Sequence, residues 1–145
     1  MKKTELAYIA GLFDGEGCIH ISRIKSSKHT HGLRHQLTVD MCMANPFLPE
    51  LFQFHFGGQY GTKKVPDDHK SQWRWRTSSH IASEFLKTIL PYLKIKRDEA
   101  LLAVEFQERI ELHGRGSSRP VTDGEFAVRE AQYILLRNLK DKSKV

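Results

Sequence analysis

The chain has 145 residues, a length that fits one ordinary folded domain. Hydrophobic residues make up 39% and charged residues 28%, so the chain has enough apolar side chains for a core and is not a disordered tail. The formal net charge of +6 favours a polyanionic partner. Two cysteines, Cys18 and Cys42, are too few for a disulfide framework, so we expect free thiols in a reducing compartment.

The sequence also bears on location. No apolar run approaches the roughly 18 residues that a membrane helix needs. The apolar residues 6–10 after Lys2 and Lys3 are similar to a signal peptide, but Glu5 and Asp14 interrupt that pattern and no small-residue cleavage site follows. We therefore expect a soluble, intracellular protein with no membrane association, located in the cytoplasm, the nucleoid or an organelle.

The positive charge is distributed unevenly along the chain. Lys and Arg outnumber Asp and Glu by nine to four in residues 17–80, which also hold seven of the eight histidines. The ratio is five to six in residues 81–112 and seven to four in residues 113–145. The excess therefore lies mainly in the segment with a strand-like pattern, where the alternative explanation is an ordinary solvated basic surface.

Hydrophobic spacing predicts the elements of the first half of the chain. Thr4 is a candidate cap for a helix that ends near residues 15–17, because apolar residues recur there at helical spacing. Period-two alternation over 19–24 and 36–43, joined by the polar residues 26–32, predicts a hairpin with one apolar and one polar face. A short apolar helix over 47–56 then ends at Gly57 and Gly58.

The second half reads as two more strands and three helices. We predict strands over 60–64 and 72–76, then a helix capped by Ser78 or Ser79 and stopped by Pro91. A helix over 97–112, a flexible basic linker over 114–120 and a last helix over 123–140 follow. The order is αββαββα with extra C-terminal helices: one mixed α+β domain over 1–145, with a core at 4–112 and a helical extension at 121–140.

The polar faces of the predicted strands carry side chains that hydrogen-bond to base edges and phosphates. This composition favours a four-stranded antiparallel sheet that binds nucleic acid over a face that is merely solvated. The candidate binding residues are His20, Ser22, Ile24, Gln36, Thr38, Asp40, Tyr60, Thr62, Lys64, Gln72, Arg74 and Arg76. The histidines lack the spacing of a metal site, so we expect His29, His31 and His35 to make loop or phosphate contacts.

Residues 9–17, Ile-Ala-Gly-Leu-Phe-Asp-Gly-Glu-Gly, carry the most specific motif of the chain. Gly11 and Gly15 lie four residues apart, so they share a helix face that a second helix can approach closely. Glu16 follows at the end of that helix, where the dipole disfavours a carboxylate by about 0.3–1 kcal/mol and a bound cation would offset the cost. The alternative is a helix that packs on its own core and ends at a glycine.

The nine residues closely resemble the LAGLIDADG motif of homing endonucleases, with Glu16 in place of the second aspartate. Residues 93–97, Leu-Lys-Ile-Lys-Arg, are similar to a segment of the single-motif members of that family. Motif, element order and lysine segment together cover roughly residues 4–112. The resemblance implies a metal-dependent enzyme that hydrolyses phosphodiester bonds of double-stranded DNA at a long pseudo-palindromic site and leaves 3′ overhangs.

The resemblance also implies roles for individual residues. Glu16 and Lys96 would be catalytic, and the Glu16 carboxylate and the Gly15 carbonyl would bind Mg²⁺, with Mn²⁺ as an alternative. One motif copy per chain implies a homodimer that meets at Gly11, Asp14 and Gly15. Asn45 would orient water, or would simply form a turn before Pro46. The alternative for Lys96 is a solvated lysine at the start of a helix.

Two other functions remain open on the same fold. One is a maturase that binds intron RNA, and the other is a DNA-binding regulator without catalytic activity. The carboxylate of Glu16 and the side chain of Lys96 favour the enzyme, because a pure binding protein needs neither of them.

Overall fold

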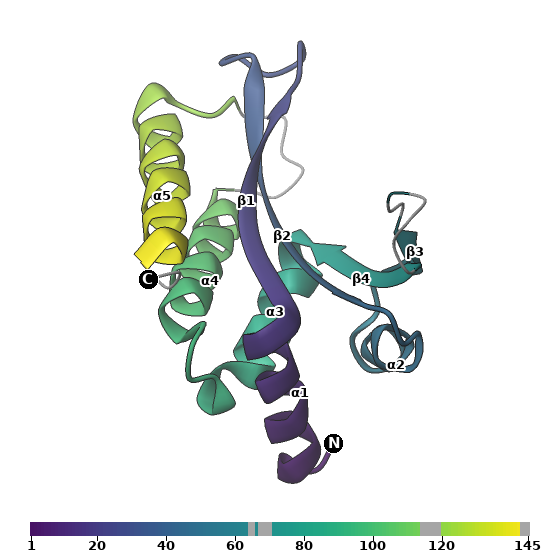
Figure 1. Ribbon diagram of the computed structural model, residues 1–145. Helices are drawn as coiled ribbons and strands as arrows, with labels where there is room; N and C mark the ends of the chain where they lie inside the picture. Colours follow the sequence, from purple (N-terminus) through teal and green to yellow (C-terminus); the bar gives the residue numbers. More distant parts are fainter. Residues whose placement is uncertain (64–65, 67–70, 114–119, 143–145) are drawn as a thin grey trace.

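The structure is a computed structural model that describes residues 1–63, 66, 71–113 and 120–142. Four strands form one antiparallel sheet, and helices cover one of its faces (Figure 1). The αββαββα order and the mixed α+β class predicted from the sequence are confirmed. The elements are α1 (Lys3–Glu16), β1 (Gly17–Lys25), β2 (Leu33–Met43), α2 (Phe47–Phe56), β3 (Gln59–Lys63), β4 (Gln72–Ser78), α3 (Ser79–Ile89), the 3₁₀ turn η1 (Leu90–Tyr92), α4 (Arg97–Leu112) and α5 (Asp123–Lys142).

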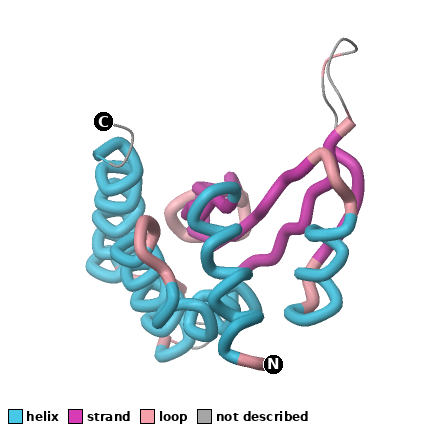
Figure 2. The backbone as a smooth tube through the Cα atoms, turned by 60° about the horizontal axis from the view of Figure 1, so that its bottom comes forward, coloured by secondary structure: helices cyan, strands magenta, loops and turns pink. Residues whose placement is uncertain are grey.

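The strand order in the sheet is β1-β2-β4-β3. β1 and β2 form a long hairpin in which Gly17 pairs with Met41 and Lys25 with Leu33. β4 pairs with the second half of β2, and β3 forms the opposite edge. Seen from below, α2 lies beside the β3–β4 end, whereas α4 and α5 lie at the other side of the sheet (Figure 2).

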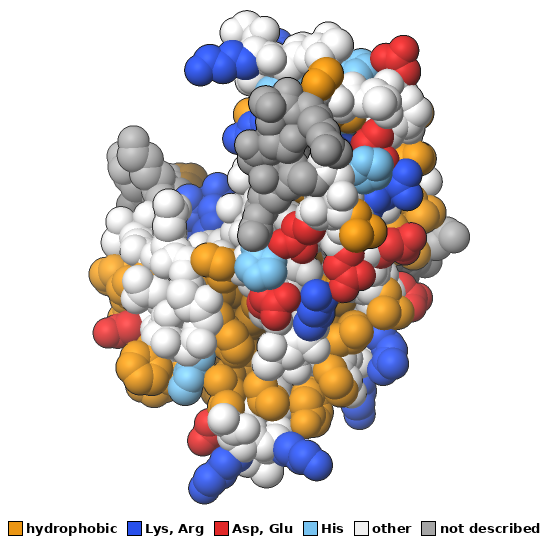
Figure 3. Space-filling view, turned by 180° about the vertical axis from the view of Figure 1, so that it is seen from behind, with side chains coloured by type: hydrophobic (Ala, Val, Ile, Leu, Met, Phe, Trp, Pro, Cys, Tyr) orange, Lys and Arg blue, Asp and Glu red, His pale blue; other side chains and the backbone are white. Residues whose placement is uncertain are grey.

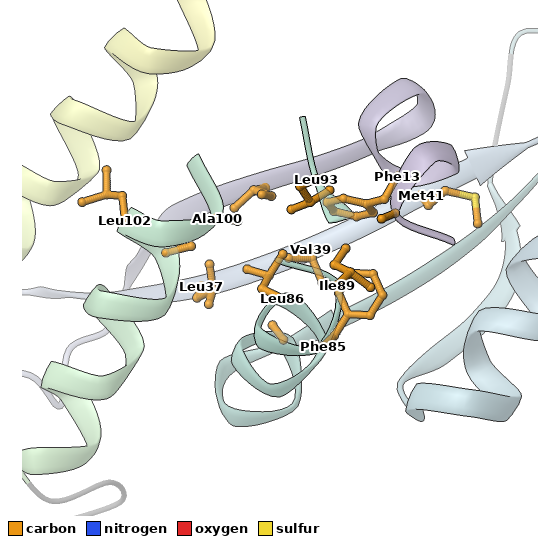
Figure 4. Close-up of a cluster of buried hydrophobic side chains, with 14 of the residues drawn as sticks. Phe13, Leu37, Val39, Met41, Phe85, Leu86, Ile89, Leu93, Ala100 and Leu102 are labelled. Atoms are coloured by element: carbon orange, nitrogen blue, oxygen red, sulfur yellow. The ribbon is translucent and has the colours of Figure 1, made fainter. Parts of the chain in front are cut away.

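The core lies between the apolar face of the sheet and the helices. Ile19, Leu37, Val39 and Met41 from the hairpin are almost completely buried, as the period-two pattern predicts. They pack with side chains from the helices, among them Phe13, Phe85, Leu86, Ile89, Leu93 and Ala100 (Figure 4). This packing fixes the end of α1 and the start of α4 against one end of the sheet.

The close approach of the Phe13 ring explains the last glycine of the nine-residue motif. A Cβ atom at Gly17 would lie 2.3 Å from the Phe13 ring, which is itself fully buried. Only glycine therefore fits where α1 passes into β1 without moving a core side chain.

Some expectations about element ends were wrong. α1 begins at Lys3, so Thr4 lies inside the first turn and is not the cap. Ser78 occupies the cap position of α3, but its side chain makes no capping hydrogen bond. α3 does end just before Pro91, as expected: its last residue is Ile89, and a 3₁₀ turn that contains Pro91 follows. Most of the linker expected at 114–120 lies outside the described residues.

None of the helices that the structure describes is long and apolar enough to cross a membrane. Both cysteines are free thiols, as expected.

Candidate functional site

The motif helix α1 has a buried face and an exposed face with different compositions. Ile9, Ala10 and Phe13 enter the core. The exposed face carries Thr4, Tyr8, Gly11 and Gly15, which recur at helical spacing, and Tyr8 is 57% exposed. A Cβ atom built on Gly11 or Gly15 would meet no heavy atom within 4 Å. This face is therefore open to a second helix, as the two glycines predict.

Glu16 is the last residue of α1 and its side chain is exposed to solvent. Among the described residues, no group of three or more His, Cys, Asp or Glu side chains has the geometry of a metal site. One chain therefore offers the Glu16 carboxylate and nearby backbone carbonyls at the end of the helix. These oxygen ligands suit a hard cation, but a complete site needs further oxygens that do not come from this chain. Phosphate oxygens and a second copy of the chain are such sources.

The Asp14 side chain, which we predicted at the dimer interface, makes hydrogen bonds within its own chain. Its carboxylate accepts hydrogen bonds from the backbone N–H groups of Lys94, Ile95 and Lys96, at 2.9, 3.2 and 3.0 Å. The side chain therefore faces the start of α4 within its own chain. It ties the motif to the lysine segment 80 residues later.

Lys96 lies beside the end of the motif helix, as the resemblance implies. Its Nζ donates a hydrogen bond of 2.6 Å to the backbone carbonyl of Asp14, two residues before Glu16. The side chain is half-buried, so it is not the solvated lysine of the alternative interpretation. The structure thus brings Glu16 and Lys96 to the same end of α1, whereas Lys94 and Arg97 are exposed.

A further acid, Glu99, lies one turn after Lys96 in α4. Burial raises the pKa of its carboxyl, and the positive charges of Lys96 and Lys140 partly oppose that shift. Glu99 is only 6% exposed and was not identified from the sequence. The carboxyl interacts electrostatically with Lys96, so Glu99 belongs to the surroundings of that lysine.

The polar face of the sheet follows from the strand register, because directly opposed residues of an antiparallel pair share a face. From β1 and β2 this face receives the predicted His20, Ser22, Ile24, Gln36, Thr38 and Asp40, and from β4 it receives Gln72, Arg74 and Arg76. Thr38 is only 6% exposed, so it has little surface for a ligand. The structure thus brings nine of the twelve predicted binding residues to one face.

The face of β3 predicted to be polar is shifted by one residue, so the predicted residues lie on the opposite face. Tyr60 lies opposite Trp75, and Thr62 lies opposite Trp73, so both share the apolar face with the tryptophans. Tyr60 stacks on Trp73 with ring centroids 5.5 Å apart. The third predicted residue, Lys64, lies outside the described residues. Period-two alternation is ambiguous in a five-residue strand, and only pairing with β4 sets its register.

Several residues of the polar face were missed. Gln59, Gly61 and Lys63 of β3 share it with the arginines of β4, and the hairpin adds Cys18, Arg34 and Cys42. Arg34 lies two residues before Gln36, so a longer alternation would have identified it. A hollow along the β3–β4 pair is lined by residues from both strands: Gln59, Tyr60, Gly61, Thr62, Arg74 and Arg76.

The two arginines of the polar face differ in their contacts. Arg76 donates to the Asp40 carboxylate across the β2–β4 pair, with an Nη2–Oδ2 distance of 3.3 Å. Its Nε atom is buried and has no hydrogen-bond partner among the described residues. Arg74 lies opposite Gly61, which leaves open space beside it. Both arginines line the hollow, and Arg76 is in addition held by Asp40.

Burial lowers the pKa of His20 on the same face. The Asp40 carboxylate opposes this shift, and the positive charges of Lys140 and Arg76 add to it. A lowered pKa favours the neutral imidazole, which can both donate and accept hydrogen bonds.

Three other predicted contacts have different partners. His31 bonds to Asp123 at 2.8 Å and His35 bonds to Glu130 at 2.6 Å, so both histidines bind α5 instead of a phosphate. The Asn45 side chain accepts a hydrogen bond of 2.8 Å from the Phe47 N–H, as the turn-forming alternative predicts.

The surface seen from behind has a different character. Acidic and basic side chains mix over its middle, and hydrophobic side chains gather over its lower part (Figure 3). Interspersed charges of both signs are typical of a solvated surface. The polar face of the sheet, with its arginines and glutamines, is therefore the better candidate for a polyanion.

The comparisons with known proteins agree with this geometry. The family model for LAGLIDADG endonucleases matches residues 9–108. No curated protein sequence matches the chain. Among solved structures, an archaeal intron-encoded homing endonuclease in complex with DNA, I-Vdi141I, has a TM-score of 0.79 at 14% identity and covers 96% of this chain and 86% of its own.

Two further structures have the same fold. The homing endonuclease I-TnaI has a TM-score of 0.66 at 14% identity, covering 95% of this chain and 97% of its own. The homing endonuclease I-CvuI, solved with target DNA in the presence of Mg, has a TM-score of 0.62 at 16% identity, covering 99% and 96%.

Proposed function

Because this chain belongs to the LAGLIDADG endonuclease family, we propose that it is a sequence-specific homing endonuclease that cleaves both strands of double-stranded DNA. The observation that carries the proposal is the exposed Glu16 carboxylate at the end of α1, with Lys96 bonded beside it and a polar sheet face continuing from the same point. The acid and the lysine supply the chemistry, and the sheet supplies recognition.

The sheet binds DNA through its polar face. Arginine and glutamine side chains reach guanine and adenine edges in the major groove, whose width admits a two-stranded ribbon such as the β1–β2 hairpin. The comparison structures solved with DNA support this role. At 14% and 16% identity, what they share with this chain is the fold. The +6 charge favours the phosphate backbone as well.

The chemistry at the end of α1 is hydrolysis of a phosphodiester bond. Glu16 orients the attacking water and takes its proton as the water oxygen bonds to phosphorus, while Lys96 stabilises the negative charge that develops on the scissile phosphate. The bond between phosphorus and the 3′ oxygen breaks, and that oxygen takes up a proton from solvent. Asp14 holds Lys96 in place through the three backbone hydrogen bonds at the start of α4. The products are a 3′ hydroxyl and a 5′ phosphate.

The site is suited to a divalent cation, with Mg²⁺ as the first candidate and Mn²⁺ as the second. The Glu16 carboxylate and the Gly15 carbonyl are hard oxygen ligands at a solvent-exposed helix end, and phosphate oxygens complete the set. When bound, the cation supplies positive charge that lowers the pKa of water and neutralises the phosphate. The I-CvuI structures in Mg and Ca support divalent metal use in a protein of this fold.

The chain acts as a homodimer. Each chain carries one Glu16, and two cuts need two acids. The open face of Thr4, Tyr8, Gly11 and Gly15 allows two α1 helices to meet with their backbones close together. This arrangement predicts a two-fold symmetric, pseudo-palindromic target and staggered cuts that leave 3′ overhangs.

The decisive experiment is cleavage of candidate intron-insertion DNA by the wild type and by Glu16→Gln, with Mg²⁺ and with EDTA. The wild type should cut only with the metal, and Glu16→Gln should bind DNA within a few-fold of the wild type without cutting it. Binding of DNA without cleavage by the wild type would instead indicate a regulator, and preferential binding of intron RNA would indicate a maturase. Cleavage by Glu16→Gln within tenfold of the wild type would exclude Glu16 from the reaction.

A further inference from the structure

The C-terminal helix α5 lies beyond the residues that the family model matches, and it runs beside the β1–β2 hairpin (Figure 1). Its contacts divide between two faces. One face holds α4, where the buried Glu125 pairs with Arg109 at 2.9 Å and Leu136 is 1% exposed. The other face contacts the hairpin.

The hairpin-facing residues of α5 recur every three or four positions along the whole helix. Asp123 bonds to His31 at the hairpin loop, and Phe126 stacks on the same histidine at 4.2 Å. Near the other end, Lys140 donates to the Cys18 sulfur at 3.2 Å, at the start of β1. α5 therefore contacts both ends of the hairpin.

The central contact joins both strands through a single carboxylate. Glu130 accepts from Arg23 of β1 at 2.8 Å and bonds to the His35 ring of β2 at 2.6 Å. Arg23 and His35 are directly opposed in the β1–β2 register. The His35 side chain is 1% exposed and that of Glu130 is 24% exposed, so the pair they form is shielded from solvent, whereas the Arg23 side chain is 43% exposed. The Asp123 side chain, in contrast, is fully exposed, and such a pair contributes little.

The bridge lies directly behind residues that we assign to DNA recognition. Side chains alternate between the two faces of a strand, so the neighbours of Arg23 and His35 point to the polar face. These neighbours are Ser22, Ile24, Arg34 and Gln36. The position and twist of this outer part of the hairpin are therefore coupled to Glu130.

We propose that Glu130 is a positioning residue for sequence recognition, which fixes the outer half of the β1–β2 hairpin against α5 so that the outer base pairs of each half-site are read. The inference rests on the proposed function. Arg23 lies seven residues beyond Glu16, about 23 Å at ~3.3 Å per residue. At ~3.4 Å per base pair the affected positions lie about seven base pairs from the cut.

The test compares target selection from randomised DNA by the wild type, Glu130→Gln and a matched control. Glu130→Gln keeps the shape of the side chain and removes its charge. The control is Glu108→Gln, because Glu108 pairs with Lys87 at 3.1 Å and joins α3 to α4 away from the hairpin. Glu130→Gln should lose about tenfold in base preference at the outer positions and keep the preference near the cut. The control should select as the wild type does.

A second measurement is independent of DNA. Hydrogen exchange of the free protein should be faster at backbone amides of residues 22–36 in Glu130→Gln than in the wild type or the control. If Glu130→Gln does not fold, Arg23→Gln removes the more exposed partner of the same bridge and should show the same two effects, reduced in size.

The outcomes separate this inference from the proposed function. A variant that keeps the wild-type preference at every position, or loses it evenly at all positions, overturns the inference while leaving the endonuclease intact. Unchanged exchange in residues 22–36 also overturns it. A wild type that selects no DNA sequence overturns the proposed function, and the inference with it.

Discussion

Lys96 and Asp14 form two hydrogen bonds with each other, which join the end of α1 to the start of α4. The backbone N–H of Lys96 donates to the Asp14 carboxylate at 3.0 Å, and its Nζ donates to the Asp14 carbonyl at 2.6 Å. Asp14, the half-buried acid of the motif, thus positions Lys96. Glu16 is the acid of the motif that faces solvent.

Asp14→Asn tests this positioning. The amide would present a donor to a backbone N–H at the start of α4, so we expect unfolding to become easier by about 1–3 kcal/mol. Cleavage should fall more than DNA binding, because Lys96 is displaced while the sheet is not. Urea unfolding and single-turnover cleavage measure the two effects. Asp98→Asn, an exposed change in the first turn of α4, is the control, and equal behaviour of both variants would contradict this role.

Gly11→Leu tests the open face of α1. Gly11 has space around it in the single chain, so the variant should fold, but its side chain would stand where a second helix must approach. We expect sedimentation to give a mass near twice 16.8 kDa for the wild type and monomers for the variant. The exposed Ala127→Leu on α5 should remain dimeric. A wild type that cleaves both strands as a monomer would disprove the dimer.

Arg74→Ala and Arg76→Ala separate base reading from phosphate binding. An arginine that reads guanine should, when removed, relax preference at one symmetric pair of positions at a cost of about 1–3 kcal/mol. An arginine that binds phosphate should instead lower affinity for every sequence and reduce the salt slope by about one. Because Asp40 holds Arg76, Asp40→Asn should alter the same positions as Arg76→Ala. Target selection from randomised DNA measures all three variants, and an unchanged profile would remove that arginine from recognition.

The lowered pKa of His20 gives stability a defined pH dependence. Above the ordinary value of 6.5 the ring is neutral in both the folded and the unfolded chain. As the pH falls below 6.5, the unfolded chain binds the proton first, so the free energy of unfolding decreases until the pH passes the folded pKa. Urea unfolding from pH 8 to pH 5 should therefore show the wild type losing stability relative to His20→Gln. A difference between the two proteins that does not change with pH would contradict this.

Local pattern was sufficient for much of the fold and for part of the site. The hairpin faces followed from alternation, because Ile19, Leu37 and Val39 are buried as predicted. The helix over 97–112 has the predicted bounds. The short strand β3 was assigned the wrong face, because five residues give too few repeats to fix the register.

The sequence by itself determined the set of elements and the residues that are candidates for catalysis and binding. These are the motif helix, Glu16 at its end and the polar strands. These follow from spacing over a few residues, which backbone geometry converts directly into faces. Only the tertiary structure decided that Asp14 faces residues 94–96, that His35 meets Glu130, and that Arg76 is held by Asp40. These partners lie 82, 95 and 36 residues apart, and no local periodicity encodes which distant side chains the packing of the core brings together.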